Sequence, residues 1–358
     1  MLILIGAGLY CIYQVDQISV KKDGIFTKQI LGLILGLVLI LVIQFIDYHF
    51  ICNISPLLYI AIVGILAYTF KFGTYVNHVR RWMSIAGIPF QPSELAKIIL
   101  IVFLAYLCNI FQSKRKKFYP FFLLAIVTVI PIILILLEPH LSPCIIILLL
   151  FGVIVLISGI SYKVILTVVL VAAPIIATVV IGVGMLKWDI PFVKPYMVNR
   201  VLDFFAGNTE DADTNAKFQQ NQSVEAIQSG GAYGKALIQE DTVKNYANIY
   251  SNESDFIFAI VGEEYGFVGC CIIIFLYLIL VLRCLKIAAH APDLMGRIIG
   301  TAISALFMFQ SFINIGVATN ILPNTGMPFP FISYGLTSLV SSMIAIGLVL
   351  DIGQQSKD

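Results

Sequence analysis

The sequence has few charged residues. Only 12% of its 358 residues are Asp, Glu, Lys or Arg, while 59% are hydrophobic. This balance excludes a soluble domain of this length and indicates a helical membrane protein. The apolar runs are continuous and do not alternate, which excludes a membrane β-barrel. The formal net charge is only +2, which gives no electrostatic basis for binding nucleic acid.

The sequence also lacks the cysteine and histidine patterns of disulfide and metal sites. Its seven cysteines are scattered, mostly within apolar runs, and no two form a CxxC pair. None lies in the long polar stretch of residues 185–254, so we interpret the cysteines as small apolar packing residues. The four histidines do not cluster, which argues against a histidine-based metal site.

Long apolar runs dominate what remains. Ten are present, near residues 1–13, 29–46, 56–72, 94–111, 119–137, 143–159, 163–184, 256–282, 298–320 and 334–351. The first is short for a span of about 20 residues, which implies a late start or a partly missing helix. A cleaved signal peptide fits poorly, because no basic region precedes this run. We predict an all-α, polytopic membrane protein, one domain over 1–358, with about ten transmembrane helices and a large extracellular loop, 185–254, between helices 7 and 8.

Basic residues in the short loops predict the orientation. Loops 112–118 and 283–297 hold four and three of them, and Lys163 and Lys357 bring that side to nine. The opposite short loops hold about six, at Lys21, Lys22, Lys28, Lys71, Arg80 and Arg81. Because cytoplasmic loops are enriched in Lys and Arg, we expect both termini in the cytoplasm and the loop 185–254 outside.

Four segments on the predicted external side have unusual sequences. They cover residues 77–97, 138–143, the long loop and 323–335, and prolines and glycines interrupt them. Irregular backbone at membrane depth is tolerated where it is buried in protein or lines a wet cavity, so these segments predict a cavity that opens outward. Within the long loop, residues 208–222 are polar and are expected to be mobile and partly disordered.

Asp255 lies where the long polar stretch meets the apolar run 256–282. A carboxylate there stands at the first turn of a predicted helix, where the helix dipole favours an anion. A simple helix-start carboxylate is the competing interpretation. Eight residues further on, Glu263 and Glu264 lie inside the apolar run, and ionisable groups at that depth suggest a function.

Further charged residues are spaced for pairing or for phosphate recognition. Glu94 and Lys97 are three apart, so they share a helix face and can pair, either as a structural salt bridge or with Lys97 free to meet a phosphate. Arg80 and Arg81 suit a pyrophosphate, because guanidinium groups match phosphate oxygens. Trp82 beside them fits an interfacial anchor equally well.

The long loop adds weaker candidates. Ser229-Gly230-Gly231, followed by Lys235, could form a phosphate-holding turn, although an ordinary loop explains it as well. Arg200 and Gln222 are further polar residues of this loop. Outward-facing carboxylates and cations on a lipid-accessible bundle suit an amphiphile with an anionic head and an acyl or prenyl tail. A transporter, an enzyme and a scaffold all remain open at this point.

Four segments resemble signatures of the shape, elongation, division and sporulation (SEDS) family. They read RRWMSIAGIPFQPSELAK, QSVEAIQSGGAYGKAL, ESDFIFAIVGEEYGFVG and FINIGVATNILPNTGMPFPFISYGLTSL. They follow the family's order and cover essentially the whole chain. The resemblance implies a peptidoglycan glycosyltransferase of the bacterial cytoplasmic membrane. Such an enzyme would polymerise lipid II onto a lipid-linked glycan strand at the outer face, with a class B penicillin-binding protein, in cell elongation, division or sporulation.

The resemblance also assigns roles to residues. The essential aspartate of the family's TDFIF motif corresponds to Asp255, as a general base or as a ligand of a divalent cation such as Mg²⁺ or Mn²⁺. No dedicated metal motif is present. The substrate-binding candidates, from the family motifs and the external loop, are Arg81, Trp82, Glu94, Lys97, Arg200, Gln222, Ser229, Gly230 and Lys235.

Two departures from the family pattern stand out. His140 replaces an aspartate that often follows the fifth span, and Leu336 replaces a glycine in the final motif, so the roles of both positions are in question. The alternatives are a lipid II flippase and a non-catalytic scaffold for the penicillin-binding protein. The unusual residues on one face, with no evident inverted repeat, disfavour a flippase, and a scaffold would leave Glu94 and Lys97 unexplained.

Overall fold

The computed structural model describes residues 1–18, 24–76, 79–85, 88–114, 117–138, 140–160, 163, 214–238, 244–249 and 252–356. The chain divides into two compact units. Unit 1 comprises Met1–Gly36, Arg200–Leu282 and Phe307–Ser342. Unit 2 comprises Leu37–Asn199, Arg283–Leu306 and Met343–Asp358.

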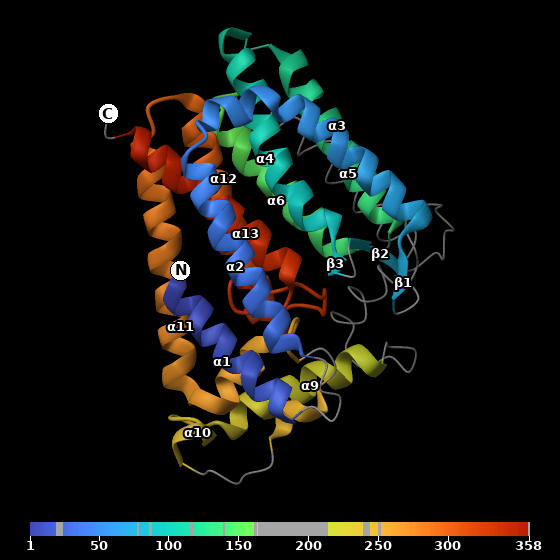
Figure 1. The fold of residues 1–358 in the computed structure, drawn as a ribbon, viewed down its shortest axis with the longest axis vertical. Helices are drawn as coiled ribbons and strands as arrows, with labels where there is room; N and C mark the ends of the chain where they lie inside the picture. Colours follow the sequence, from blue (N-terminus) through green and yellow to red (C-terminus); the bar gives the residue numbers. More distant parts are fainter. Residues whose placement is uncertain are drawn as a thin grey trace. The chain divides into compact units, whose positions relative to one another are not determined.

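Nine of the ten apolar runs are helices (Figure 1). These are α1 (Leu2–Ile18), α2 (Ile25–Gln44), α3 (Tyr48–Phe72), α4 (Pro92–Ile110), α5 (Phe118–Leu137), α6 (Leu141–Ile157), α11 (Ile257–Ala289), α12 (Leu294–Ala318) and α13 (Leu336–Gln355). Seven of them are long and apolar enough to cross a membrane, while α1 and α6 are shorter apolar helices. The run 163–184 lies outside the described residues, except for Lys163. The prediction of an all-α, polytopic membrane protein is confirmed.

Local sequence explains where several helices begin and bend. Asp47 caps α3 by accepting a hydrogen bond from the His49 amide at 2.8 Å, and Pro92 occupies the first turn of α4, where its missing N–H costs nothing. In α11 the regular helix breaks at Gly266, whose φ of 66° and ψ of −164° are not helical. Glycine tolerates this conformation at little cost, so α11 is kinked there.

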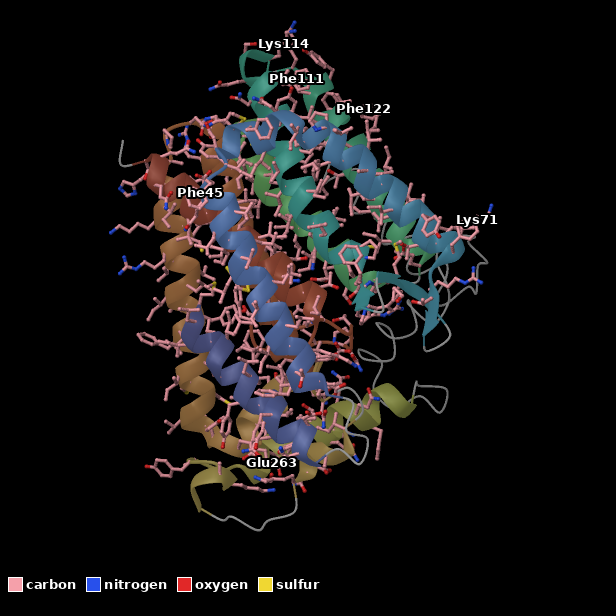
Figure 2. All side chains as sticks on the ribbon, in the orientation of Figure 1. Phe45, Lys71, Phe111, Lys114, Phe122 and Glu263 are labelled. Carbon is pink, nitrogen blue, oxygen red and sulfur yellow. The ribbon has the colours of Figure 1, made fainter. Side chains whose placement is uncertain are left out.

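In unit 2, α3 packs along α4 and α5, and α6 packs along α5 and α4 (Figure 1). Their core is aliphatic, with Leu66, Ile101, Leu104, Ile146 and Ile147 buried. Other large apolar side chains face outward, as lipid-facing residues should. Phe45 and Phe122 project from unit 2 in Figure 2 and are 90% and 59% exposed.

A small antiparallel sheet precedes α4. Its strands are β1 (Thr74–Val76), β2 (Val79–Ile85) and β3 (Ile88–Phe90), in the order β1-β2-β3. Trp82 pairs with Thr74, and Met83 with Phe90. The expectation of irregular backbone over 77–97 was therefore wrong for these strands. The strands pair their backbone groups with one another, so they need no helix to satisfy them.

In unit 1, the described part of the long loop contains α9 (Thr214–Ser229), α10 (Lys235–Ile238) and the short 3-10 helix η2 (Asn245–Asn248). The predicted disorder was wrong for residues 214–222, which belong to α9, while 208–213 lie outside the described residues. Gln220 donates to the carbonyls of Val317 and Leu322 at 3.1 and 2.8 Å. Ser223 donates to the carbonyl of Ala318 at 2.8 Å. The last carbonyls of a helix lack partners within it. Gln220 and Ser223 supply donors to such carbonyls at the end of α12, and these bonds order α9.

Candidate functional site

Asp255 lies in the turn of residues 252–256, immediately before α11, and its side chain is half-buried. The Asn314 side chain, on α12, fixes this turn. Its Nδ2 donates to the Asp255 carbonyl at 2.9 Å and to the Met327 carbonyl at 2.7 Å. One buried amide therefore joins the Asp255 backbone to the loop that follows α12.

That loop, residues 323–335, also contacts the turn directly. The Tyr334 amide donates to the Glu253 carbonyl at 2.8 Å, and the Ser333 hydroxyl donates to the Ser254 carbonyl. Gly326 has a φ of +66°, and a Cβ there would lie 3.3 Å from Asp255 Oδ2. The Asp255 carboxylate thus lies beside the Gly326 backbone. Two segments that the sequence separates by about 70 residues form one site.

Glu263 and Glu264, on α11, are buried and hold Lys235 and residues 244–246 in place. Glu263 accepts hydrogen bonds from the Asn245 and Tyr246 amides at 2.8 and 2.9 Å and pairs with Lys235. Glu264 pairs with Lys244 at 2.8 Å and accepts from the Tyr246 hydroxyl at 2.9 Å. Figure 2 marks Glu263 among the side chains of unit 1. These contacts give both carboxylates a structural role, and the sequence carried no local sign of their partners Lys244 and Tyr246.

The glycine-rich turn after α9 packs directly on α11. A Cβ at Gly230 would lie 2.0 Å from the Gly262 carbonyl oxygen, and one at Gly234, where φ is +83°, would lie 2.1 Å from that of Glu264. Ser229 donates its hydroxyl to the Ala226 carbonyl at 2.8 Å. Close packing alone accounts for these glycines. A phosphate at this turn stays a prediction.

The other candidates of the long loop make no contact among the described residues that points to a substrate-binding role. Gln222 lies on α9, and its Oε1 is buried without a hydrogen-bond partner in the described part of the chain. Lys235 lies at the start of α10 and is already paired with Glu263. Arg200 lies outside the described residues.

In unit 2, Glu94 and Lys97 form the predicted pair. Their Oε1 and Nζ atoms are 2.8 Å apart, and the residues are only 5% and 2% exposed. Each residue of this buried pair depends on the other, because an unpaired charge in a low-dielectric environment is costly. Lys97 is therefore a fixed cation of the buried site.

Four further polar residues gather near this pair. Arg81, half-buried on β2, donates from Nε to the Glu138 carbonyl at 3.1 Å. Gln91 Nε2 lies 3.2 Å from His140 Nδ1. Arg81 and Lys97 both lie close enough to His140 to affect its charge. We call this group, with Glu94 and Lys97, the Arg81–Lys97 cluster.

Burial decides the charge of this cluster. It raises the pKa of Glu138 to about 8, although the nearby Arg81 charge opposes the rise. Burial, with the charges of Arg81 and Lys97, lowers the pKa of His140 well below its usual value. At neutral pH, Glu138 and His140 are uncharged. The positive charges of Arg81 and Lys97 then exceed the one negative charge of Glu94, so the cluster suits an anion. Trp82, beside Arg81, is half-buried.

A metal ion at Asp255 would need further ligands. Among the described residues, no three His, Cys, Asp or Glu side chains are grouped so that they could hold a metal ion. Hard cations such as Mg²⁺ are usually bound by one or two protein carboxylates together with substrate phosphates and water. Asp255 by itself is thus not a protein-built metal centre. It lies in unit 1, whereas the Arg81–Lys97 cluster lies in unit 2.

Comparison with known proteins gives a consistent result. A family model described as "Cell cycle protein", which groups FtsW, RodA and SpoVE, matches residues 1–358. The chain is 28% identical to the peptidoglycan glycosyltransferase RodA of Treponema pallidum, over 98% of this chain and 95% of that protein. It is 30% identical to a probable peptidoglycan glycosyltransferase FtsW of a Geobacter species, over 99% and 95%.

A solved structure is similar as well. Its title describes structural coordination of polymerization and crosslinking by a peptidoglycan synthase complex. The matching chain has a TM-score of 0.80 and 25% identity, and the match covers 99% of this chain and 97% of that one. The similarity in fold extends over nearly the whole length of both.

Proposed function

Because the chain belongs to the FtsW/RodA/SpoVE family of cell cycle proteins, we propose that it polymerises lipid II into glycan strands with Asp255 as the general base. It is a peptidoglycan glycosyltransferase, as are the relatives named above. The observation that carries the role of Asp255 is its position. Its turn is held by Asn314 and by the loop 323–335, so the Asp255 backbone is fixed just before α11, with the carboxylate beside Gly326.

The proposed reaction is an inverting glycosyl transfer. The 4-hydroxyl of the GlcNAc in lipid II attacks the anomeric carbon of the lipid-linked strand, and the bond from that carbon to the pyrophosphate oxygen breaks. The proton of the attacking hydroxyl passes to the Asp255 carboxylate. Base catalysis of this kind typically contributes about 10²–10⁴-fold. A base carried on a turn whose backbone is held, as proposed for Asp255, loses less entropy in reaching its geometry in each turnover.

The leaving group is undecaprenyl pyrophosphate, which departs as an anion and needs no added proton. Its growing charge needs stabilisation, which preorganised cations supply in a water-poor site. Arg81 and Lys97 are the described candidates, because their cluster carries excess positive charge while Glu138 and His140 are neutral. Arg200 is the further candidate from the sequence. A divalent cation, with Asp255 as a ligand, would supply the same stabilisation of negative charge.

The partner and the setting are also proposals. The similar chain in the synthase complex supports a class B penicillin-binding protein as the partner that cross-links the strands. The basic residues of the short loops support termini in the cytoplasm and a reaction at the outer face. The seven long apolar helices support a multi-pass membrane location.

The test is polymerisation by the purified chain. We expect labelled lipid II in detergent or vesicles to be converted into a ladder of glycan strands, with and without the penicillin-binding protein. Leu278→Ala, at a 51% exposed position on α11, serves as the unaffected control. Lipid II that crosses the bilayer without forming strands would indicate a flippase, and no change in lipid II would indicate a scaffold; either result contradicts the proposal.

A further inference from the structure

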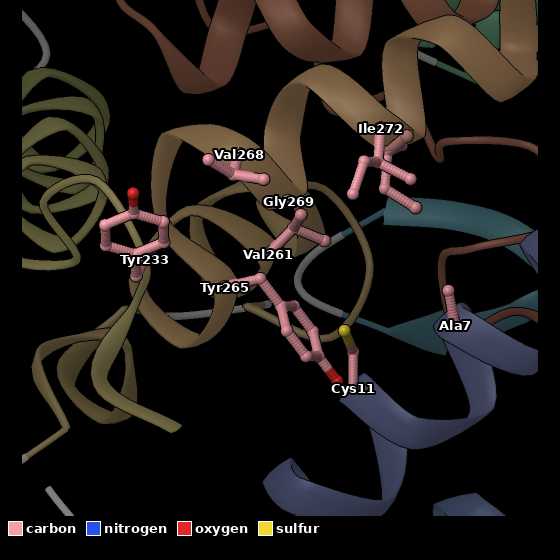
Figure 3. A pocket seen from close by; sticks show the side chains of 9 residues that line it. Ala7, Cys11, Tyr233, Val261, Tyr265, Val268, Gly269 and Ile272 are labelled. Atoms are coloured by element: carbon pink, nitrogen blue, oxygen red, sulfur yellow. The ribbon is translucent and has the colours of Figure 1, made fainter. Parts of the chain in front are cut away.

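Unit 1 contains an apolar pocket between α1 and α11. Its volume is about 340 Å³, and it is lined by Ala7 and Cys11 from α1 and by residues of α11, among them Val261, Val268 and Ile272. Figure 3 shows the α1 side chains opposite those of α11, with Tyr233 at the end away from Ala7. None of the catalytic or cationic residues discussed above lines it.

The chemistry of the walls selects a hydrocarbon. An apolar cavity of about 150 Å³ already stays dry and takes up benzene, because water needs two to four polar partners. This pocket is larger and offers few. An unfilled space also costs its lining the lost dispersion contacts. For a membrane protein, the apolar molecules that surround α1 and α11 are lipid chains.

One end of the pocket has the features of a membrane interface. Tyr233 lies at the end away from Ala7, and Tyr265, which also lines the pocket, packs on Tyr10 with ring centroids 5.9 Å apart. Tyrosines gather at the level of lipid headgroups, with the ring in apolar surroundings and the hydroxyl in water. A molecule with a polar head at this end and a tail toward Ala7 matches both ends of the pocket.

The charges near that end disfavour a pyrophosphate head. The cations that follow Tyr233, Lys235 and Lys244, are paired with the buried carboxylates Glu263 and Glu264. These pairs cancel, so the described residues near this end leave no excess positive charge to attract a multiply charged head. A phospholipid head carries one phosphate charge, which in phosphatidylethanolamine is balanced by its own ammonium group. Such a head does not need an excess of positive charge on the protein.

From these observations we propose that the pocket binds one acyl chain of a bilayer phospholipid. The chain would lie against the bend of α11, because Tyr265, Val268 and Gly269 flank the non-helical Gly266. α11 begins two residues after Asp255. A bound chain would thus brace the helix whose start positions the Asp255 turn.

Photolabelling of the full chain tests the proposal. The purified protein in detergent micelles is titrated with phosphatidylglycerol that carries a diazirine in its acyl chain. After illumination, peptide mass spectrometry locates the labelled residues. We expect saturable labelling of the pocket residues, close to one lipid per chain, that unlabelled phospholipid competes away.

Two blocking variants and one control make the result specific. Val268→Trp fills the pocket from α11 and Ala7→Phe fills it from α1, so a folding defect in one leaves the other informative. Each should reduce labelling of the pocket about tenfold, the factor expected from losing the burial of about two methylene groups. Leu278→Trp, on the exposed face of α11 outside the pocket, should leave it unchanged.

Three outcomes would overturn the proposal. One is labelling spread evenly along α11, as for ordinary boundary lipid. The second is undiminished labelling in whichever blocking variants fold. The third is stronger labelling of the same residues by a diazirine-bearing polyprenyl pyrophosphate than by the phospholipid, which would assign the pocket to an isoprenoid tail.

Discussion

Glu94 and Lys97 are the clearest case in which single residues depend on each other. Their charged atoms are 2.8 Å apart and almost inaccessible to solvent. We predict that Glu94→Ala and Lys97→Ala each lower the yield of folded protein or its activity, because the remaining buried charge costs about 3–5 kcal/mol.

The double variant separates pairing from independent roles. Combining the two changes should be no worse than either alone, since the pair is lost once. The measurement is folded yield and polymerisation rate for all four proteins of the cycle. Additive effects would instead mean that Lys97 acts alone, for example on a pyrophosphate.

Glu138 predicts a dependence of stability on pH. In the folded chain its pKa is raised from 4.5 to about 8. Between these values the unfolded state releases the proton that the folded state keeps. The free energy of unfolding therefore falls as pH rises through this window, by up to about 1.4 kcal/mol per pH unit.

Glu138→Gln keeps the shape of the neutral acid and removes this titration. We expect the unfolding temperature of the native chain to fall relative to that of the variant as pH rises toward about 8, measured by thermal unfolding in detergent. His140, neutral and buried in both proteins, should cancel in the comparison. Parallel curves for the two proteins would show that Glu138 is already ionised in the folded state.

At the scale of elements, the contact between α11 and the turn after α9 depends on glycine. We predict that Gly230→Ala displaces the turn, because a Cβ would lie 2.0 Å from the backbone oxygen of Gly262. Tryptic cleavage after Lys235 and Lys244 should become faster, and folded yield should fall.

Gly231→Ala is the matched control in the same turn. Its Cβ would meet nothing within 4 Å, so only its φ of +55° is unfavourable, at a cost of about 1–3 kcal/mol. We expect Gly231→Ala to remain folded, with Lys235 and Lys244 protected from trypsin. Equal effects of the two changes would mean that backbone strain, and not the approach to α11, sets the need for glycine.

The elements show which features a sequence can predict. The apolar runs predicted the helices, because backbone groups in hydrocarbon must pair within their own segment. The order of α9 depends on the carbonyls of Val317, Ala318 and Leu322, far along the chain, so its polar composition misleadingly suggested disorder. The three-stranded sheet was missed because glycine and proline in this segment suggested irregular backbone. Pairing between the strands satisfies the backbone groups, and this pairing has no sequence signal.

The candidate site was predicted unevenly. Asp255 and the Glu94–Lys97 pair were found because their positions relative to apolar runs and their spacing are visible in the sequence. The importance of Asn314 was not visible, because its amide acts through two carbonyls from separate segments. The neutral state of Glu138 and His140 depends on burial by several helices and has no sequence signal.

At the scale of the whole molecule, the loop charges predict an orientation. Fusions of alkaline phosphatase, which is active only outside the cytoplasm, should be active within the loop 185–254 and inactive at the C-terminus. A fusion in the short loop 112–118, with its four basic residues, should also be inactive. The reverse pattern would place the Asp255 turn and the proposed chemistry on the cytoplasmic face.

The central claim is that the intact chain polymerises glycan strands with the Asp255 carboxylate as its base. The most direct measurement compares the rates at which the purified native chain and Asp255→Asn polymerise labelled lipid II. Asn caps a helix about as well as Asp, so folding, membrane insertion and partner binding should persist.

If Asp255 takes the proton, the amide cannot replace it, and the rate should fall by at least about 10²-fold. The polymerising activity of Leu278→Ala should stay at the native level. A rate for Asp255→Asn close to that of the native chain would contradict the account.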